Sequence, residues 1–183
     1  MEYFEKTLSE KHIYSGKIIN VESLEVLLPD GKKATRDIIT HPGASVVIPI
    51  SDNGEVYMVR QYRKPIEQET LEVPAGKLDP GEEPIECAKR ELTEETGLTA
   101  KKVKHLVSVY STPGFSNEIL HIYAATELTQ GEAHADEDEF ISSEKISVNK
   151  LVNMVLKHEI TDSKTIIGIL LADKIVKGEI SMD

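Results

Sequence analysis

The segment from Gly76 to Leu98 constrains the fold more than any other part of the chain, because it joins a glycine-containing loop to a strongly patterned helix. Pro84 suits the first turn of this helix, and Gly97 suits the left-handed residue that ends it. At about 100° per residue, three apolar side chains fall on one stripe. The sequence therefore predicts a helix over residues 84–96 with a buried stripe formed by Ile85, Ala88 and Leu92.

Three glutamates lie beside that stripe. Glu91 and Glu95 are four residues apart and Glu91 and Glu94 are three apart, so the three carboxylates share one helical face. Like charges at these spacings destabilise a helix by about a few tenths of a kcal/mol per pair. One interpretation is a solvated acidic face. We favour a cation site, because the glutamates border the core, the loop carbonyls can point to the same place, and hard oxygen ligands suit Mg²⁺ or Mn²⁺.

The charge of the chain also favours a cation and argues against a nucleic-acid partner. The net charge is −11, from 21 basic and 32 acidic residues. Such a surface repels a nucleic-acid backbone, and a phosphate ester would need a divalent cation to offset the same repulsion. Cys87 is the sole cysteine, so no internal disulfide forms. Because no signal-peptide pattern and no bilayer-length apolar stretch is present, we expect a cytoplasmic protein that does not bind membranes.

Short apolar or alternating runs, separated by turn signals, predict strands around the helix. Residues 44–50 are continuously apolar, which is typical of a buried central strand. The N-terminal part reads as strands joined by a turn at Pro29-Asp-Gly31. We interpret residues 1–42 as an N-terminal β-sheet domain and residues 43–183 as the main domain. Strands are expected at residues 17–21, 23–28, 36–40, 55–62, 70–74, 103–110 and 118–125.

Two helices are expected at the C-terminus. Ser147 can cap the first, and Asp162 or Ser163 can cap the second. The second helix carries an apolar stripe, which predicts that it covers a core. The six histidines are scattered, and no pair has the spacing of a zinc site.

The loop and helix together resemble the signature box of the Nudix hydrolase superfamily. Gly76 is followed after five residues by Glu82, then after seven by Arg90-Glu91-Leu92, and the pattern ends in Glu94-Glu95, one residue, and Gly97-Leu98. Every specified position of the box is filled. The resemblance implies an α/β (α+β) fold, an α/β/α sandwich with a mixed sheet, here with an N-terminal antiparallel β-sheet extension.

The same resemblance implies roles for the residues of the box. Glu91 and Glu95 would bind metal together with the carbonyl of Ala75, and Glu94 would ligate or orient a metal or a water. Arg90 would position the carboxylates, and Glu82 would support the loop and helix. The implied cofactor is Mg²⁺, with Mn²⁺ as a substitute.

Features outside the box resemble the ADP-ribose pyrophosphatase branch of the superfamily. Pro113 lies 16 residues after Gly97, Arg60-Gln-Tyr-Arg63 ends a strand, and Arg36 precedes His41-Pro-Gly-Ala44. The alternatives are a turn proline and surface basic residues. Guanidinium groups match phosphate oxygens, which makes these arginines candidates for substrate binding. The candidate substrate-binding residues are Arg36, Arg60, Arg63, Pro113 and Glu118.

The acidic stretch Ala135-Asp-Glu-Asp-Glu139 resembles the loop that supplies the water-activating glutamate in that branch. A carboxylate outside the box is needed, because glutamates that hold metal cannot also take the proton. Glu137 is the first choice for the general base and Glu139 the second, while a solvated acidic loop is the alternative. The resemblance also implies a homodimer in which two subunits exchange their N-terminal sheets.

The sequence therefore predicts an enzyme that hydrolyses the pyrophosphate of ADP-ribose to AMP and ribose 5-phosphate. The nearest alternative is the same chemistry on another nucleoside-diphosphate sugar or on an oxidised nucleotide. An alternative of a different class is a non-catalytic regulator that senses a sugar nucleotide. The filled box argues against that regulator.

Overall fold

The computed structural model describes residues 3–131 and 140–183. Its contacts divide the chain into two compact units, which are described in turn. The first unit comprises Met1–Gly43 together with Tyr110–Ile119, and the second comprises Ala44–Val109 together with Leu120–Asp183. The predicted division into residues 1–42 and 43–183 stays a prediction.

The first unit is a three-stranded antiparallel sheet of β1 (Lys6–Ser15), β2 (Asn20–Leu27) and β3 (Lys33–Thr40), in that order. The predicted turn closes the β2–β3 hairpin, with Gly31 at a φ of 83°. The segments 17–21 and 23–28, which we expected to be two strands, instead give the single strand β2. The first strand lies earlier, where the alternation of polar and apolar residues is weak because all of β1 is exposed.

The second unit is built on β4 (Ala44–Pro49), which is buried throughout. Its sheet has the order β7-β4-β9-β8, formed with β7 (Ala75–Lys77), β8 (Leu98–Tyr110) and β9 (Ile119–Gln130). Because β4 runs parallel to β9 and antiparallel to β7, this sheet is mixed. A second, antiparallel sheet has the order β10-β5-β6, from β5 (Glu55–Arg63), β6 (Gln68–Glu72) and β10 (Ser142–Ser147). A short 3₁₀ helix, η1 (Lys64–Ile66), joins β5 to β6.

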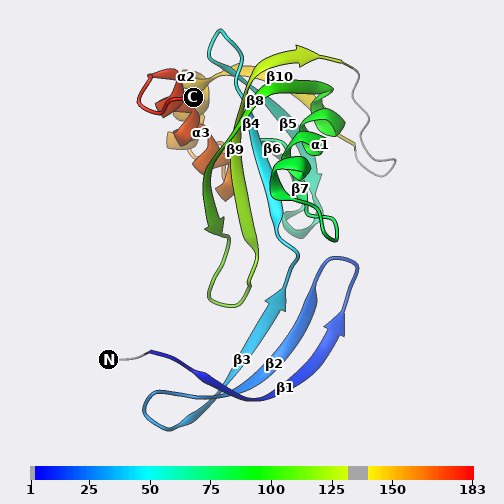
Figure 1. Ribbon diagram of the computed structural model, residues 1–183, viewed down its shortest axis with the longest axis vertical. Helices are drawn as coiled ribbons and strands as arrows, with labels where there is room; N and C mark the ends of the chain where they lie inside the picture. The colour runs from blue at the N-terminus through cyan, green and yellow to red at the C-terminus, as the bar shows by residue number, and fades with distance from the viewer. Residues whose placement is uncertain (1–2, 132–139) are drawn as a thin grey trace. The chain divides into compact units, whose positions relative to one another are not determined.

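Helices cover both faces of β4 because alternate side chains of a strand point to opposite sides. Val46 and Ile48 belong to a core that includes Ile169 of α3 (Ser163–Val176). Val47 belongs to a separate core with Ala88 and Leu92 of α1 (Pro84–Thr96). Figure 1 shows α1 and α3 on opposite sides of the sheet, with α2 (Val148–Leu156) beside α3. This arrangement, with the N-terminal antiparallel sheet, confirms the fold predicted from the sequence.

The ends of the helices follow the sequence in part. Gly97 ends α1 at a φ of 71°, and its N–H donates to the carbonyl of Thr93 at 2.8 Å. Asp162 caps α3 by accepting from the N–H of Thr165. Ser147 precedes α2, but its side chain makes no capping hydrogen bond within the described ranges. No helix in those ranges is both long and apolar enough to cross a membrane.

A buried carboxylate joins the second sheet to α3. Glu72, at the end of β6, is 2% exposed. It accepts hydrogen bonds from Arg63 of β5, at 2.6 and 2.8 Å, and from Thr70 at 2.5 Å. It also accepts one from Lys164 in the first turn of α3. Burial alone would raise the pKa of Glu72, but the hydrogen bonds of Arg63 and the charge of Lys164 lower it to about 2.

The low pKa of Glu72 predicts a loss of stability in acid. The ordinary pKa is 4.5, so the ionised carboxylate stabilises the fold above that pH, and this contribution is lost as the pH falls toward 2. The full contribution is on the order of 3 kcal/mol. We expect the free energy of unfolding, measured in urea from pH 6 to pH 2.5, to fall more steeply for the wild type than for Glu72→Gln. Parallel curves for the two proteins would contradict the prediction.

Candidate active site

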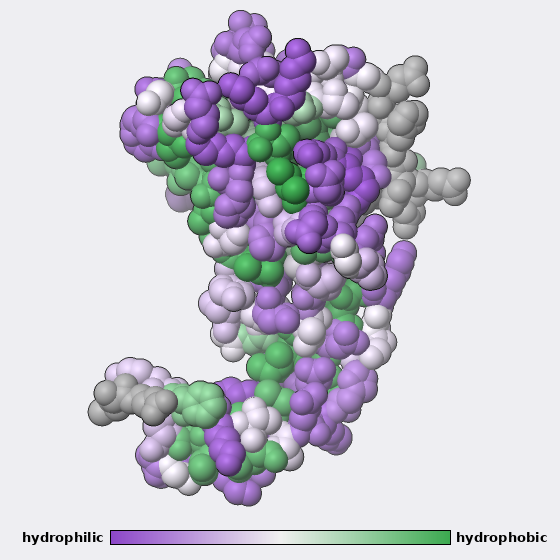
Figure 2. Space-filling view, in the orientation of Figure 1, coloured by the Kyte–Doolittle hydropathy of each residue, from purple (hydrophilic) through white to green (hydrophobic). Residues whose placement is uncertain are grey.

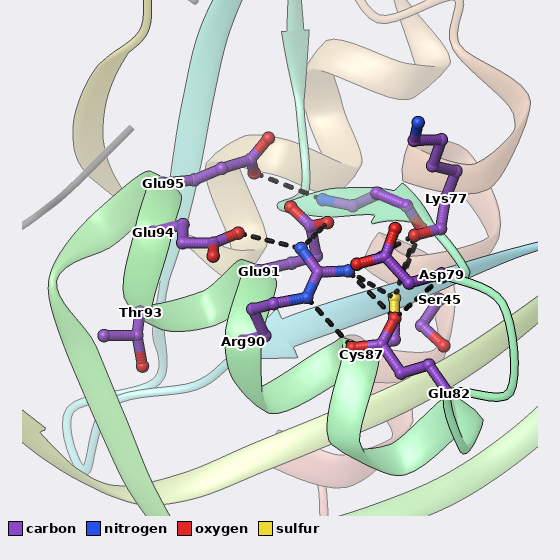
Figure 3. Close-up of polar contacts among 12 residues, drawn as sticks. Ser45, Lys77, Asp79, Glu82, Cys87, Arg90, Glu91, Thr93, Glu94 and Glu95 are labelled. Atoms are coloured by element: carbon purple, nitrogen blue, oxygen red, sulfur yellow. Dashed lines mark hydrogen bonds and ion pairs between the residues drawn. The ribbon is translucent and has the colours of Figure 1, made fainter. Parts of the chain in front are cut away.

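The predicted metal-binding carboxylates lie where α1 meets the loop that precedes it (Figure 3). Glu91 and Glu95 are one helical turn apart and are 8% and 7% exposed. Glu94 is on the same stretch of α1, with a third of its side chain exposed. Figure 2 shows a mostly hydrophilic surface where α1 lies in Figure 1. Two of the three carboxylates are thus buried beneath a polar surface.

The backbone of β7 packs directly against these carboxylates. A Cβ atom on Gly76 would lie 1.8 Å from Oε1 of Glu91, so any other residue would collide with that carboxylate. One residue earlier, the N–H of Ala75 donates to Oε2 of Glu95 at 3.2 Å. The glycine at the start of the box is therefore required by a close approach, because the glutamate fills the space of a side chain.

Arg90 ties the loop to the helix. Its Nε and Nη2 donate to the carboxylate of Glu82 at 2.9 and 3.0 Å. Its Nη1 donates to Glu91 at 2.6 Å and to Glu94 at 2.8 Å, and Nη2 also reaches the carbonyl of Lys77 at 3.3 Å. One guanidinium thus holds three carboxylates, as Figure 3 shows.

Arg90 and Glu82 shift each other's pKa. Hydrogen bonds from Arg90 lower the pKa of Glu82 to about 2, although burial acts in the opposite direction. The bonds to Glu82, and then the charge of Glu91, raise the pKa of Arg90. Arg90 is thus the cation that pairs with Glu82, Glu91 and Glu94.

Cys87 lies under the loop and contributes a neutral thiol. Its Sγ is 3.5 Å from the carbonyl oxygen of Gly76 and 3.4 Å from that of Lys77. Burial, and then the charge of Glu82, raise the pKa of this thiol to about 11. It is therefore protonated at neutral pH and acts as a weak donor to the loop, because a thiol is nucleophilic only as the thiolate.

The donors at this junction fit a hard divalent cation. Glu91 and Glu95 supply carboxylate oxygens, and the carbonyl of Ala75 is an oxygen donor from the adjoining strand. In the part of the chain that the structure describes, no three histidine, cysteine, aspartate or glutamate side chains group as a metal site. The predicted set of Glu91, Glu95, Glu94 and the carbonyl of Ala75 therefore stays a prediction. Glu82 is less suited, since Arg90 occupies both of its oxygens.

The predicted substrate-binding residues fall into two groups. Arg60 and Arg63 belong to the second unit, but they are three residues apart on β5 and so point to opposite faces. Arg60 pairs with Glu144 at 2.7 Å, whereas Arg63 pairs with Glu72. The structure therefore does not bring these two arginines together.

The remaining predicted residues belong to the first unit. Arg36 pairs with Glu5 at 2.6 Å. Glu118 accepts from the hydroxyl of Ser111 at 2.5 Å, in the same loop as Pro113. Both candidates for the general base, Glu137 and Glu139, lie outside the described residues.

Two charged residues of the second unit, Glu72 and Lys164, were not among the predicted site residues. Glu72 is the one acidic residue in the otherwise apolar run Leu71-Glu-Val-Pro-Ala75. A lone charge in such a run is the signal that could have identified it, because buried carboxylates are retained only with partners. Lys164 carries no comparable signal, since a lysine in the first turn of a helix is usually solvated.

The contact between Gly76 and Glu91 predicts that Gly76→Ala displaces the carboxylate without unfolding the protein. We expect the affinity for Mn²⁺, measured by calorimetry, to fall about 10-fold to 100-fold, as when the support of a metal ligand is lost. Gly114→Ala is the matched control, because a Cβ there would meet no atom within 4 Å. Equal Mn²⁺ affinity in Gly76→Ala and the wild type would contradict this packing argument.

Comparisons with known proteins agree with this geometry. Residues 39–167 match the NUDIX domain, and residues 5–39 match the nucleoside diphosphate sugar hydrolase N-terminal domain. The chain is 44% identical to an ADP-ribose pyrophosphatase of Bacillus subtilis (strain 168), over 88% of each protein. It is 41% identical to a methanol dehydrogenase activator of Bacillus methanolicus, over 90% of each.

A third relative, an ADP-ribose pyrophosphatase of Mycobacterium tuberculosis, is 35% identical over 94% of this chain and 85% of its own. The crystal structure of an ADP compounds hydrolase superposes with a TM-score of 0.85 at 22% identity, over 96% of this chain and 95% of that one, which supports the fold. The resemblance seen in the sequence is thereby confirmed: the chain belongs to the Nudix family and is a pyrophosphohydrolase of that family.

Proposed function

We propose that this enzyme hydrolyses the pyrophosphate bond of ADP-ribose to AMP and ribose 5-phosphate, with Mg²⁺ as its cofactor. The observation that carries the proposal is the buried pair Glu91 and Glu95, packed against the loop backbone and held beside Arg90. The names of the relatives support a nucleoside-diphosphate sugar as the substrate class. ADP-ribose is the member of that class that two of them name.

In this proposal Glu91, Glu95 and the carbonyl of Ala75 hold the metal, and Glu94 ligates or orients a metal or a water. A bound cation, Mg²⁺ or Mn²⁺ in its place, would offset the charge of the pyrophosphate and make a water more acidic for in-line attack on phosphorus. Arg90 keeps Glu91 and Glu94 in place through its hydrogen bonds and does not touch the reacting atoms. This role is positional, as expected of a residue behind a metal ligand.

The proton of the attacking water passes to Glu137, with Glu139 as the second choice. Glu82 is a poor base, because Arg90 holds its pKa at about 2 and both of its oxygens accept from that guanidinium. The stretch 135–139 supplies further carboxylates from outside the box. A base from that stretch leaves the glutamates of α1 to the metal.

Substrate binding is assigned to Arg36, Arg60, Arg63, Pro113 and Glu118. Arg63 is the best supported, because 39% of its side chain is exposed and the carboxylate of Glu72 holds its guanidinium at 2.6 and 2.8 Å. The alternatives are another nucleoside-diphosphate sugar or an oxidised nucleotide as substrate, and a non-catalytic sensor of a sugar nucleotide. The net charge of −11 argues against nucleic acid as a partner.

We also propose that the enzyme is a cytoplasmic homodimer that exchanges its N-terminal sheets. In support, every residue of β1 is exposed, and its apolar side chains Leu8, Ile13 and Tyr14 are 41%, 52% and 55% exposed. A single three-stranded sheet with an apolar exposed strand gains stability by covering it.

The proposal is tested by a product assay over a panel of dinucleotides and sugar nucleotides with Mg²⁺, run in ¹⁸O-labelled water. We expect ADP-ribose to be the best substrate and Glu95→Gln to lower turnover by about two orders of magnitude or more while the protein stays folded. Glu86→Gln is the matched control, because Glu86 is on the same helix but pairs with Lys89 at 2.8 Å on its exposed side. A near-normal rate for Glu95→Gln in saturating Mg²⁺ would refute the ligand role.

The general base is tested by a pair of variants. We expect Glu137→Gln to lower kcat by about 100-fold or more with little change in KM, since a general base acts in the chemical step. Glu139→Gln is expected to have the smaller effect. If Glu139→Gln alone lowers kcat, the order of the two candidates is wrong, and if neither does, the base lies elsewhere.

A further inference from the structure

Glu72 is the centre of a charged cluster that the box does not include. Its buried carboxylate carries bonds from two cationic side chains, those of Arg63 and Lys164. Asp162 accepts a second bond from Lys164 at 3.0 Å. The two carboxylates and the two cationic side chains carry equal and opposite charges. The cluster therefore orients hydrogen-bond donors without adding a net charge.

Glu72 fixes the orientation of the Arg63 guanidinium. Nε and Nη2 of Arg63 both point at the carboxylate, at 2.8 and 2.6 Å, which is the two-bond arrangement that sets the plane of the fork. Within the described ranges Nη1 makes no hydrogen bond, and 39% of the side chain is exposed. Nη1 is therefore the atom of the guanidinium that remains available to an incoming acceptor.

Lys164 is held in a similar way. Its side chain is 12% exposed, and its ammonium bonds to both Glu72 and Asp162, the residue that caps α3. An ammonium has three donors, and these two bonds use two of them. The group also lies in the first turn of α3, where the helix dipole adds positive potential.

The cluster adjoins the metal-binding carboxylates through a short stretch of backbone. The N–H of Val73 donates to the hydroxyl of Thr165 at 3.0 Å, and the N–H of Ala75 donates to Glu95 at 3.2 Å. Glu72 and Ala75 are three residues apart, so their Cα atoms are at most about 11 Å from each other. The charge of Glu95 also contributes to the raised pKa of Arg63, after the larger effect of Glu72.

We propose that Glu72 is a positioning residue that aims Nη1 of Arg63 and the ammonium of Lys164 at non-bridging oxygens of the substrate's pyrophosphate. Lys164 thereby becomes a further substrate-binding residue. This inference rests on the proposed function. A cluster that only stabilised the fold would not need a half-exposed guanidinium, since well-packed apolar residues stabilise as well as a buried ion pair.

The test compares KM and kcat for ADP-ribose in folded variants with Mg²⁺. We expect Glu72→Gln and Lys164→Met each to raise KM about tenfold or more and to change kcat less. Lys164→Met removes a charge-assisted contact to the bound substrate, and Glu72→Gln removes the carboxylate that orients Arg63 and Lys164. Lys174→Met is the matched control, since Lys174 is on the same helix and pairs with Glu179 at 2.8 Å on the exposed side. Its KM is expected to equal that of the wild type.

A double-mutant cycle separates positioning from a general loss of structure. If Glu72 acts through Arg63, Glu72→Gln raises KM by a clearly smaller factor in the Arg63→Ala background than in the wild type, because only its effect through Lys164 remains. The same increase in both backgrounds would overturn the proposal, as would an unchanged KM in folded Glu72→Gln. If Glu72→Gln does not fold, the test uses Arg63→Lys instead. A lysine lacks the planar fork of arginine, so it cannot bond to Glu72 and also offer a second fixed edge to the substrate. An unchanged KM there overturns the proposal.

Failure of the proposed function is distinguishable from failure of this inference. If the wild type hydrolyses none of the panel, the proposed function is wrong, and the same variants are then compared by calorimetric binding of ADP-ribose. Weaker binding in Arg63→Ala and Lys164→Met, with Lys174→Met unchanged, still supports the assignment of these two cations. Equal binding in all variants, or none in the wild type, overturns it.

Discussion

The hydrogen bonds of the Arg90 guanidinium hold the loop and the helix of the acidic site together. It joins Glu82 of the loop to Glu91 and Glu94 of α1. Without this cation, the carboxylates at the loop–helix junction would repel one another in a partly buried place, where charges are weakly screened. With it, the loop is held close enough for the backbone at Gly76 to contact Glu91. The acidic site and the local fold therefore depend on the same side chain.

The central strand β4 explains why the site can be rigid. Its side chains enter two separate cores, one shared with α3 and one shared with α1. On the α1 side, the hydroxyl of Ser45 also donates to the carbonyl of Pro84 at 2.6 Å, which anchors the first turn of the helix. Glu91 and Glu95 are thus presented from an element fixed by packing on one face and by Arg90 on the other.

Much of this arrangement could be predicted from the sequence, because local rules decide it. The helix from Pro84 to Thr96 follows from its apolar stripe, the proline at its start and the glycine after its end. The burial of β4 follows from its continuous apolar run. The contact of Gly76 with Glu91 could be predicted only as a family pattern, since nothing local indicates that a carboxylate fills the space of a side chain.

Other parts depend on contacts between distant residues and could not be predicted. Glu72 and Lys164 are 92 residues apart in the chain, so no periodicity relates them. β1 was missed because an exposed strand lacks an alternating pattern. Arg60 and Arg63 were both predicted to bind substrate, but the pleat of β5 separates them, and of the two Arg63 meets a buried carboxylate.

The neutral thiol under the loop has a practical consequence. Cys87 is the sole cysteine of the chain, and it is fully buried against the backbone of the loop that precedes α1. Alkylating reagents attack thiolates that they can reach, so the native enzyme should be inert to them and each labelled molecule must first have opened. The rate at which Cys87 is alkylated, followed by mass spectrometry, therefore reports how often the loop–helix junction opens. No residue has to be introduced for this measurement.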